Sequence, residues 1–503
     1  MTVSVNSAAL SGIDAILITI ETRVCTGVSY FIVGLPGEAV KESLFRVESA
    51  LSSCGFDMPR QKILISLAPA GIRKEGAVFD LPIALSILAA SGQLQPEQMD
   101  GVLFTAELSL SGKLRPVKGA LSVAIEARKA GFKTLVIPKE NADEAAMVKD
   151  LAVFGLATLN GVVDFLRDPT SLVPTAIATR EMFAQDQQLY NADFADVHGQ
   201  ENVKRALEIM AAGSHNGLMI GPPGTGKTML ATRLPGILPP LTLQEALETT
   251  RIYSVAGKLD CTGLMSHRPF RAPHHTASDI SLVGGGSVPM PGEISLAHNG
   301  VLFMDELPEF KRRVLEVLRQ PLEERQVAIS RANFSANFPA NFILLAALNP
   351  CPCGYFRHPD RRCTCTAQAI RSYISKISGP LLDRIDLHIT VQPVQSGSKN
   401  MTERSAAVRQ RVIAARAVQL KRAGISNAQM NTAMVRQFCA LGKTEQELLN
   451  QAMVQHKLSA RSYDRILKMA RTIADLADSN SIDLAHLAEA IHLRQLDKDY
   501  LSK

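Results

Sequence analysis

The sequence predicts an α/β protein of several domains that ends in a helical region, and three observations support this prediction. The chain has 503 residues, more than one hydrophobic core organises, so two to four domains are expected. Its hydrophobic fraction of 46% and charged fraction of 20% are those of a globular protein. Strand and helix patterns alternate before residue 400, whereas only helical patterns follow it.

Nothing in the sequence predicts a membrane segment or a secretory signal. No run of 18 apolar residues free of charge occurs, and the first 15 residues lack a basic start and an apolar centre. We therefore expect a cytoplasmic protein with no membrane partner.

The charge of the chain is mildly positive and unevenly placed. The net charge is +6, and residues 401–503 contain 16 Lys and Arg against 10 Asp and Glu, so the whole excess lies there. A basic helical region can face phosphates, but a solvated helical face explains the same charge. The absence of Trp and the aromatic fraction of 5% give little support to a base-stacking platform.

Residues 1–168 read as alternating strands and helices. A β-rich run covers 63–70, and 101–117 reads as two strands joined at Ser111-Gly112. Residues 39–55 predict an amphipathic helix, with the stripe Val40, Leu44, Val47 and Leu51. Residues 169–192 lose this periodicity and contain two prolines, so they predict a linker.

The stretch GPPGTGKT, residues 221–228, matches the phosphate-binding loop pattern GxxxxGK[ST]. Its glycines let backbone N–H groups surround phosphates at the start of a helix. The pattern assigns Lys227 to the β- and γ-phosphates and Thr228 to Mg²⁺. A buried strand over 216–220 and a helix over 228–238 give it the expected context. The sequence therefore predicts a nucleoside triphosphate site.

Two later strands end in polar residues that would complete this site. The apolar run 301–304 ends in Asp305 and Glu306, which fit a Mg²⁺ ligand and a residue that orients the attacking water. The next strand ends at Asn349, where open α/β sheets bind ligands. Arg384 follows a short helix and Arg461 opens a later one, and each would stabilise phosphate charge unless it forms a surface ion pair.

These motifs together resemble AAA+ ATPases of the magnesium-chelatase-like clade. The stretches DFADVHGQENVKRAL, GPPGTGKT, VLFMDE, NP at Asn349-Pro350, LLDRID and LSARSYDR carry the resemblance. RPFRAPHHTAS and NPCPCGY narrow it to the ComM/YifB family, over essentially the full length. The resemblance implies an AAA+ P-loop NTPase domain at 193–395 and a C-terminal helical lid at 396–503.

The resemblance also implies a role for each site residue. Lys227 and Thr228 belong to Walker A, Asp305 and Glu306 to Walker B; Asn349 would be sensor 1, Arg384 the arginine finger and Arg461 sensor 2, for which Arg465 is the weaker candidate. The remaining nucleotide-binding positions are Gly221, Pro222, Pro223, Gly224, Thr225, Gly226 and Met229. ATP and Mg²⁺ are the implied cofactors. A homo-hexameric ring is implied because a neighbouring subunit must supply the finger.

The first 168 residues resemble the Lon-protease-like domain, a ribosomal S5-like α+β fold. Lon-type enzymes use a Ser–Lys pair, and the corresponding positions here fall near Val78 and Leu121. Neither side chain can do that chemistry, and nothing indicates that Ser66 and Lys118 form a pair. Proteolysis is therefore not expected; a ring around DNA, as in RadA-type helicases, and a hexamerisation platform remain open.

A long insertion separates the P-loop helix from Walker B. It contains Arg268, Arg271, His274 and His275 and the glycines 284–286. The resemblance implies that it projects into the pore of the ring; metal binding by the two histidines lacks further ligands. Residues 325–342, with Arg325 and Arg331, form a second candidate pore element.

Four cysteines crowd one short stretch, namely Cys351, Cys353, Cys363 and Cys365. Disulfides are not expected in a cytosolic chain, and four thiolates suit a closed, structural Zn²⁺ site. CxC is less typical than CxxC, so His358 as a ligand and reduced cysteines without metal both remain alternatives.

The family resemblance implies an ATP-driven DNA motor. Its described role is branch migration during natural transformation, with single-stranded and branched DNA and a recombinase as partners. The alternative is the motor subunit of a metal chelatase, which remodels a protein partner. The Lon-like region and the absence of a DxSxS motif argue against that alternative.

Overall fold

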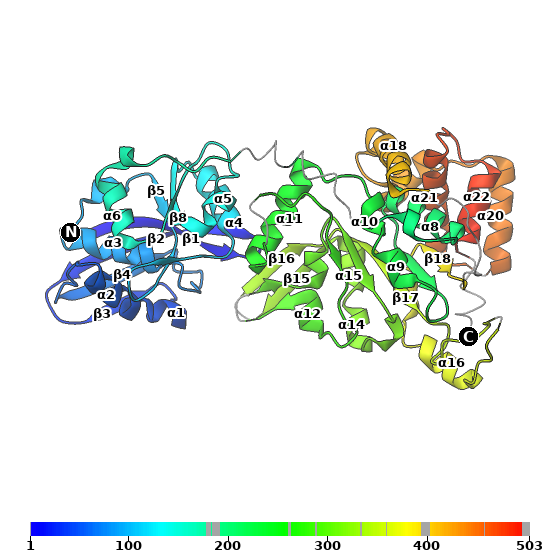
Figure 1. Cartoon of the computed structure of the whole chain (residues 1–503), viewed down its shortest axis with the longest axis horizontal. Coiled ribbons are helices and arrows are strands. Elements are labelled where there is room, and N and C mark those ends of the chain that lie inside the picture. Colours follow the sequence, from blue (N-terminus) through cyan, green and yellow to red (C-terminus); the bar gives the residue numbers. More distant parts are fainter. Residues whose placement is uncertain are drawn as a thin grey trace.

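The computed structural model describes residues 2–177, 183, 192–259, 263–286, 289–331, 334–358, 360–393, 403–456 and 458–494. Three regions follow one another along the longest axis, an N-terminal mixed sheet, a central parallel sheet and a helical C-terminal region (Figure 1). Most of the predicted linker and the stretch before the C-terminal helices lie outside the described residues. No helix within the described ranges is long and apolar enough to cross a membrane.

The N-terminal region is built on a seven-stranded sheet in the order β3-β4-β2-β1-β5-β8-β9. Its strands are β1 (Thr2–Ser11), β2 (Asp14–Cys25), β3 (Tyr30–Val33), β4 (Lys62–Ala68), β5 (Val102–Phe104), β8 (Thr134–Pro138) and β9 (Ala152–Leu156). A small ladder pairs β6 (Glu107–Leu108) with β7 (Leu114–Arg115). The helices are α1 (Glu38–Lys41), α2 (Ser43–Ser53), α3 (Asp80–Ala90), α4 (Ala120–Lys129), α5 (Ala142–Ala145) and α6 (Leu159–Arg167).

The expected elements of this region are present with shifted ends. The predicted helix over 39–55 is divided into α1 and α2 at Glu42, and its stripe faces the core, with Val40, Val47 and Leu51 fully buried. The predicted strand pair over 101–117 comprises β5, β6 and β7, and its turn lies at Ser111-Gly112 as expected.

The central region contains a five-stranded parallel sheet in the order β11-β14-β17-β10-β18. The strands are β10 (Gly217–Ile220), β11 (Phe270–Arg271), β14 (Val301–Met304), β17 (Ile343–Leu348) and β18 (Leu387–Thr390). Two antiparallel ladders lie beside it, β12 (Gly284–Gly285) with β13 (Met290–Pro291), and β15 (Gln326–Arg331) with β16 (Phe334–Pro339). The apolar strands β10, β14 and β17 are buried along their whole length, as parallel strands covered on both faces should be.

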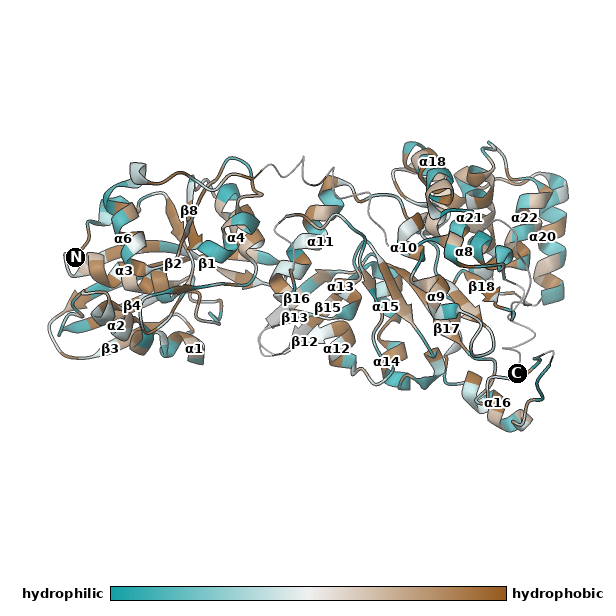
Figure 2. Cartoon of the chain, in the orientation of Figure 1, coloured by the Kyte–Doolittle hydropathy of each residue, from teal (hydrophilic) through white to brown (hydrophobic). Residues whose placement is uncertain are grey.

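Helices surround this sheet and complete the C-terminal region. Those of the central region are α8 (Glu201–Gly213), α9 (Lys227–Ala231), α10 (Leu234–Ile237), α11 (Leu243–Ala256), α12 (Asp279–Val283), α13 (Glu293–Leu296), α14 (Arg312–Glu316), α15 (Arg319–Glu324), α16 (Ala367–Ile374) and α17 (Gly379–Leu382). Those of the C-terminal region are α18 (Ser405–Ala423), α19 (Thr432–Phe438), α20 (Lys443–His456), α21 (Ala460–Leu476) and α22 (Leu484–His492). Figure 2 shows hydrophobic strands in the sheets and helices with alternating hydrophobic and hydrophilic faces. α18 and α21 pack on α8, so the helical region shares a core with the central one.

The N-terminal and central regions meet at a polar contact that we call the joint, made by Asp14, Gly119, Glu144, Arg251 and Ser254. Arg251 on α11 pairs with Asp14 at the start of β2, 2.5 Å between Nη2 and Oδ1. The Ser254 hydroxyl donates to Glu144, and the Gly119 N–H donates to the Ser254 carbonyl at 3.2 Å. α11 therefore connects the N-terminal region directly to the central sheet.

Candidate nucleotide site

The predicted phosphate loop follows the carboxyl end of β10, the strand between β17 and β18. Gly224 and Gly226 have φ angles of 78° and 82°, which favour glycine. A Cβ on Gly221 would collide with the carbonyl oxygen of Val391, so glycine is required there by close approach. The predicted helix after the loop is two short helices, α9 and α10, that meet just before Pro235.

Lys227 is buried, with 9% of its surface exposed. Its Nζ donates to the carbonyl oxygens of Gly221 and Pro222, both at 2.8 Å, and to Asn349 Oδ1 at 3.1 Å. Burial lowers its pKa, and the nearby carboxylates of Asp305 and Glu306 oppose that shift. The two backbone carbonyls and the Asn349 amide oxygen are neutral acceptors. The charged oxygens of a phosphate group would bind the Lys227 ammonium more strongly than these acceptors do.

The three predicted acidic and amide residues meet the loop at one edge of the sheet. Asp305 and Glu306 follow the carboxyl end of β14, and Asn349 follows that of β17. Thr228 Oγ1 donates to Asp305 Oδ2 at 2.7 Å. Neighbouring ligands of an octahedral Mg²⁺ with bonds of 2.0–2.1 Å lie about 2.9 Å apart, so this oxygen pair fits that ion.

Arg384 lies at the opposite edge of the same sheet. It precedes the amino end of β18, which is parallel to β10, and the four-residue strand separates the two edges by roughly 13 Å. Arg384 Nη2 pairs with Glu323 Oε1 at 2.6 Å and Nη1 donates to the Pro380 carbonyl at 2.6 Å. Its Nε is buried without a hydrogen-bond partner in the described part of the chain.

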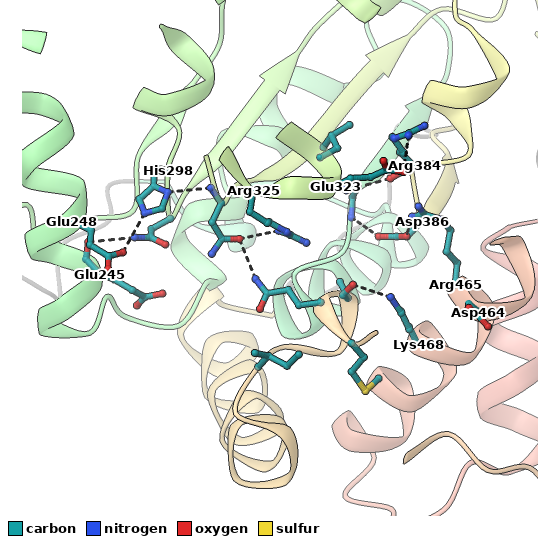
Figure 3. A pocket seen from close by; sticks show the side chains of 18 of the residues that line it. Glu245, Glu248, His298, Glu323, Arg325, Arg384, Asp386, Asp464, Arg465 and Lys468 are labelled. Atoms are coloured by element: carbon teal, nitrogen blue, oxygen red, sulfur yellow. Dashed lines mark hydrogen bonds and ion pairs between the residues drawn. The ribbon is translucent and has the colours of Figure 1, made fainter. Parts of the chain in front are cut away.

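Arg384 and Arg461 line one pocket of about 810 Å³, and no residue of the phosphate loop lines it. Figure 3 shows Arg384 in this pocket with Glu323, Asp386 and Arg465. Arg461 is exposed, whereas Arg465, one turn further along α21, is paired with the buried Asp386. Burial alone would raise the pKa of Asp386, but Arg465, His215 and the Asn216 N–H outweigh burial and hold it below the usual range. Of the two candidates for sensor 2, Arg461 is therefore the exposed one, whereas an ion pair holds Arg465.

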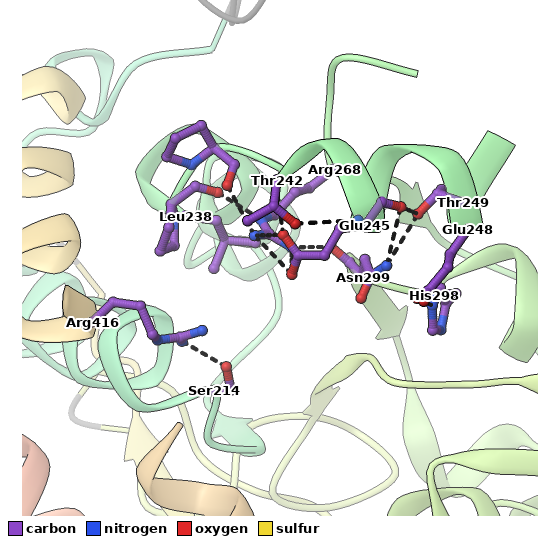
Figure 4. A network of polar contacts seen from close by, with 12 residues as sticks. Ser214, Leu238, Thr242, Glu245, Glu248, Thr249, Arg268, His298, Asn299 and Arg416 are labelled. Carbon is purple, nitrogen blue, oxygen red and sulfur yellow. Dashed lines mark hydrogen bonds and ion pairs between the residues drawn. The ribbon is translucent and has the colours of Figure 1, made fainter. Parts of the chain in front are cut away.

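Two arginines of the insertion, Arg268 and Arg271, are paired within the central region; Figure 4 shows Arg268 beside Glu245 and Asn299. Arg268, with 9% of its side chain exposed, donates to the Pro239 and Asn299 carbonyls and pairs with Glu245. Arg271 pairs with Glu293 at 2.6 Å. The side chain of Arg331 lies outside the described residues.

His275 reaches the predicted Walker B pair, which the sequence did not indicate. Its Nδ1 lies 3.5 Å from Glu306 Oε2. The residue follows β11, and β11 lies beside β14 in the sheet. His275 and Glu306 are 31 positions apart, and no sequence pattern connects them; only the strand order reveals the contact.

The four cysteines gather into one cluster whose sulfur atoms all lie within 4.8 Å of one another. Sγ–Sγ distances are 3.3 Å for Cys351–Cys353, 3.7 Å for Cys351–Cys363 and 3.6 Å for Cys353–Cys363. A tetrahedral Zn²⁺ with Zn–S bonds of 2.3 Å places its sulfurs about 3.8 Å apart. The Sγ–Sγ distances of the cluster are therefore close to those that a zinc ion requires. A hydrogen bond from the Tyr355 N–H lowers the pKa of Cys353 to about 5, and burial raises that of Cys351 to about 12.

The cysteine cluster also touches the phosphate loop. Gly354 has a φ of 82°, and a Cβ there would collide with the ring of Pro223. His358 Nδ1 accepts from the N–H groups of Asp360 and Arg361, so the structure shows it engaged with its own loop. The loop that contains the cysteines therefore packs against the phosphate loop at Pro223.

The two positions to which the Lon resemblance assigns a Ser–Lys pair hold apolar side chains. Val78 is half-buried and packs against the N-terminal cores, and Leu121 is fully buried. The Leu121 N–H donates to Glu144 Oε1 at 2.8 Å, the carboxylate that also accepts from Ser254. Leu121 therefore lies next to the joint.

A parallel sheet in this order, with a phosphate loop after a central strand and acidic and amide residues after its neighbours, defines a P-loop protein of the AAA+ class. Comparison with known families agrees. Residues 193–399 match "Magnesium chelatase, subunit ChlI", residues 20–141 match "Subunit ChlI of Mg-chelatase", and residues 402–494 match "Magnesium chelatase, subunit ChlI C-terminal".

Full-length relatives give the particular family. The chain is 46% identical to the competence protein ComM of Haemophilus influenzae over 98% of this chain and 97% of that protein. It is 44% identical to YifB of Escherichia coli, again over 98% and 97%. The chain belongs to the ComM/YifB family of magnesium-chelatase-like AAA+ proteins, and this family implies ATP and Mg²⁺ as cofactors.

The resemblance to Lon proteases is partial. Lon protease 2 of Bacillus subtilis is 26% identical over 157 residues, which is 28% of this chain and 27% of that protein.

Proposed function

We propose that the protein is an ATP-driven hexameric motor that moves DNA during recombination. One observation supports a ring of several copies. The phosphate loop follows the carboxyl ends of the strands and Arg384 precedes their amino ends, so one chain does not bring the two together. A neighbouring copy that presents its arginine pocket to the loop would complete the site. Such head-to-tail contacts form a closed ring when the rotation between neighbouring copies closes.

Each residue then has a role in hydrolysis. Lys227 and Thr228 would hold the β- and γ-phosphates and Mg²⁺, and Asp305 would share the ion. Glu306 would accept a proton from the attacking water, and Asn349 would position that water or the γ-phosphate. Arg384 and Arg461 of the neighbour would stabilise charge on the transferred group.

DNA is the proposed cargo. It is supported by full-length similarity to a protein named for competence and by the basic excess in residues 401–503. Branch migration that integrates single-stranded DNA, with a recombinase as partner, is the specific activity we propose. The N-terminal region would serve as a platform for the ring or enclose DNA.

Zinc is the metal ion that we propose the four cysteines bind. Because Gly354 packs on Pro223, the metal would stabilise the conformation of the phosphate loop. Its role would be structural, since four protein ligands leave no open position.

The second candidate is a chelatase motor subunit, favoured by the family descriptions that match all three regions. Such a subunit would use ATP hydrolysis to remodel a protein partner. The two candidates therefore differ in what stimulates hydrolysis.

The test is ATP turnover with and without single-stranded and branched DNA, with Lys227→Ala as the blank. Stimulation by DNA that is abolished in Lys227→Ala is the expected result, and a branch-migration assay would follow. Turnover indifferent to every DNA would overturn the DNA motor and favour a protein partner.

A further inference from the structure

The insertion brings one side chain to the proposed catalytic carboxylate. His275 and Glu306 follow neighbouring parallel strands, β11 and β14, at the edge of the sheet where the phosphate loop lies. Among the described residues, His275 is the only basic side chain within ion-pair distance of Glu306, at 3.5 Å from Nδ1 to Oε2. About half of the Glu306 side chain is exposed, so little else holds its carboxylate.

The imidazole of His275 is itself held in place. The ring of His274 lies against it, with centroids 4.1 Å apart, and Phe310 presents its edge at 6.5 Å. The Ala277 N–H donates to the His274 carbonyl at 2.9 Å, which closes the turn that carries both histidines. Only one third of the His275 side chain is exposed. A ring fixed in this way can define the position of a mobile carboxylate.

The backbone at Glu306 makes such a partner necessary. The residue has a φ of 51°, and its N–H donates to Asp305 Oδ1 at 2.9 Å. These contacts fix its main chain beside the Mg²⁺ ligand but leave the carboxylate free to rotate. A general base acts only when it is held within reach of the proton that it accepts, and a third group commonly orients it.

We propose that His275 is a positioning residue that orients the Glu306 carboxylate toward the attacking water. The Nδ1–H would donate to Oε2 and leave Oε1 to receive the proton. This inference rests on the proposed role of Glu306 as the base. It assigns to the insertion a function in hydrolysis, in addition to any contact with DNA.

The decisive variants are His275→Ala and His275→Asn. Removal of the ring is expected to lower kcat roughly tenfold, with KM and nucleotide affinity unchanged, since only the orientation of the base is lost. The Asn amide nitrogen occupies nearly the place of Nδ1, so His275→Asn should recover most of kcat. The measurement is steady-state ATP turnover of the full chain, with affinity from a fluorescent nucleotide.

His492→Ala is the matched control, because that exposed histidine lies at the end of α22, outside the nucleotide site. It should cost at most a few-fold in kcat. An equal loss in both alanine variants, no rescue by Asn, or a loss confined to KM would each overturn the inference. Glu306→Gln tests the proposed base separately: if it hydrolyses ATP at the wild-type rate, the assignment of Glu306 fails whatever His275 does.

Discussion

Asp386 shows how one buried carboxylate organises the arginine pocket. It receives the Asn216 N–H at 2.9 Å and pairs with Arg465, while His215 Nδ1 lies 3.5 Å away. Lys468 lines the same pocket, and burial lowers its pKa despite Asp386. The carboxylate therefore compensates a set of cations that would otherwise repel one another.

Replacement of this carboxylate should destabilise the chain. Asp386→Asn is expected to cost about 3 kcal/mol, because it strands Arg465 without its partner. The melting temperature of the central region should fall, as followed by calorimetry. Asp383→Asn, in the same loop, should change it little, and an equal fall in both would contradict this role.

The same pair predicts a pH dependence with a defined sign. The pKa of Asp386 is lowered in the folded chain, so its contribution is present above the unfolded carboxyl pKa of about 3.9 and is lost as the pH falls below it. The difference in melting temperature between wild type and Asp386→Asn should shrink below about pH 4. A difference that persists unchanged to pH 2 would speak against the ion pair.

At the scale of elements, the cysteine loop and the phosphate loop act as one unit. Gly354 stands against Pro223, and α16 follows the last cysteine directly. The side chain of Tyr373 on α16 is buried, and burial together with Glu309 raises its pKa. A change in the cysteine cluster should therefore be felt at the nucleotide.

Loss of zinc is predicted to weaken nucleotide binding. Cys363→Ser should lower the zinc content measured by elemental analysis from one equivalent toward zero and weaken nucleotide affinity several-fold. Cys25→Ser, on β2 and far along the chain from the cluster, is the matched control and should leave both unchanged. Wild-type protein that contains no zinc and still binds nucleotide with normal affinity would contradict the proposed zinc site.

Sequence patterns predict those elements whose signals are local. The apolar runs of β10, β14 and β17 and the polar residues that end them required only adjacent positions. The lengths of α9 and α10 did not follow from the same reasoning, because the helical pattern runs through the break before Pro235. The ion pair of Arg268 with Glu245, 23 positions away on α11, did not follow from its place in the insertion.

The site itself was predictable only in part for a related reason. Local motifs identify Lys227, Thr228 and Asp305, but the edge of the sheet on which Arg384 lies depends on the strand order. That order also creates the contact between His275 and Glu306. Neither follows from composition or spacing.

For the whole molecule, the separation of the two edges predicts complementation between subunits. Glu306→Gln and Arg384→Ala should each abolish turnover alone. Mixed in equal amounts, they should recover up to roughly a quarter of wild-type turnover, because one interface in four then combines an intact base with an intact arginine. No recovery in rings that demonstrably exchange subunits would place Arg384 outside the shared site.

The joint predicts a coupling between regions that charge reversal should disturb. Arg251→Glu places two carboxylates together at Asp14 and should lower the melting temperature, whereas Asp14→Arg combined with Arg251→Glu should restore it. Because Asp14 is largely exposed, the expected effect is below about 1 kcal/mol. Additive losses in the double variant would exclude this pair from the joint.

The burial of Leu121 has an evolutionary consequence. A lysine at that position would have to place its charge inside the core that supports the joint, beside a carboxylate already bound to Ser254. Installing a Ser–Lys pair would therefore take at least two substitutions, at Val78 and at Leu121, and the second would change a buried side chain next to the joint.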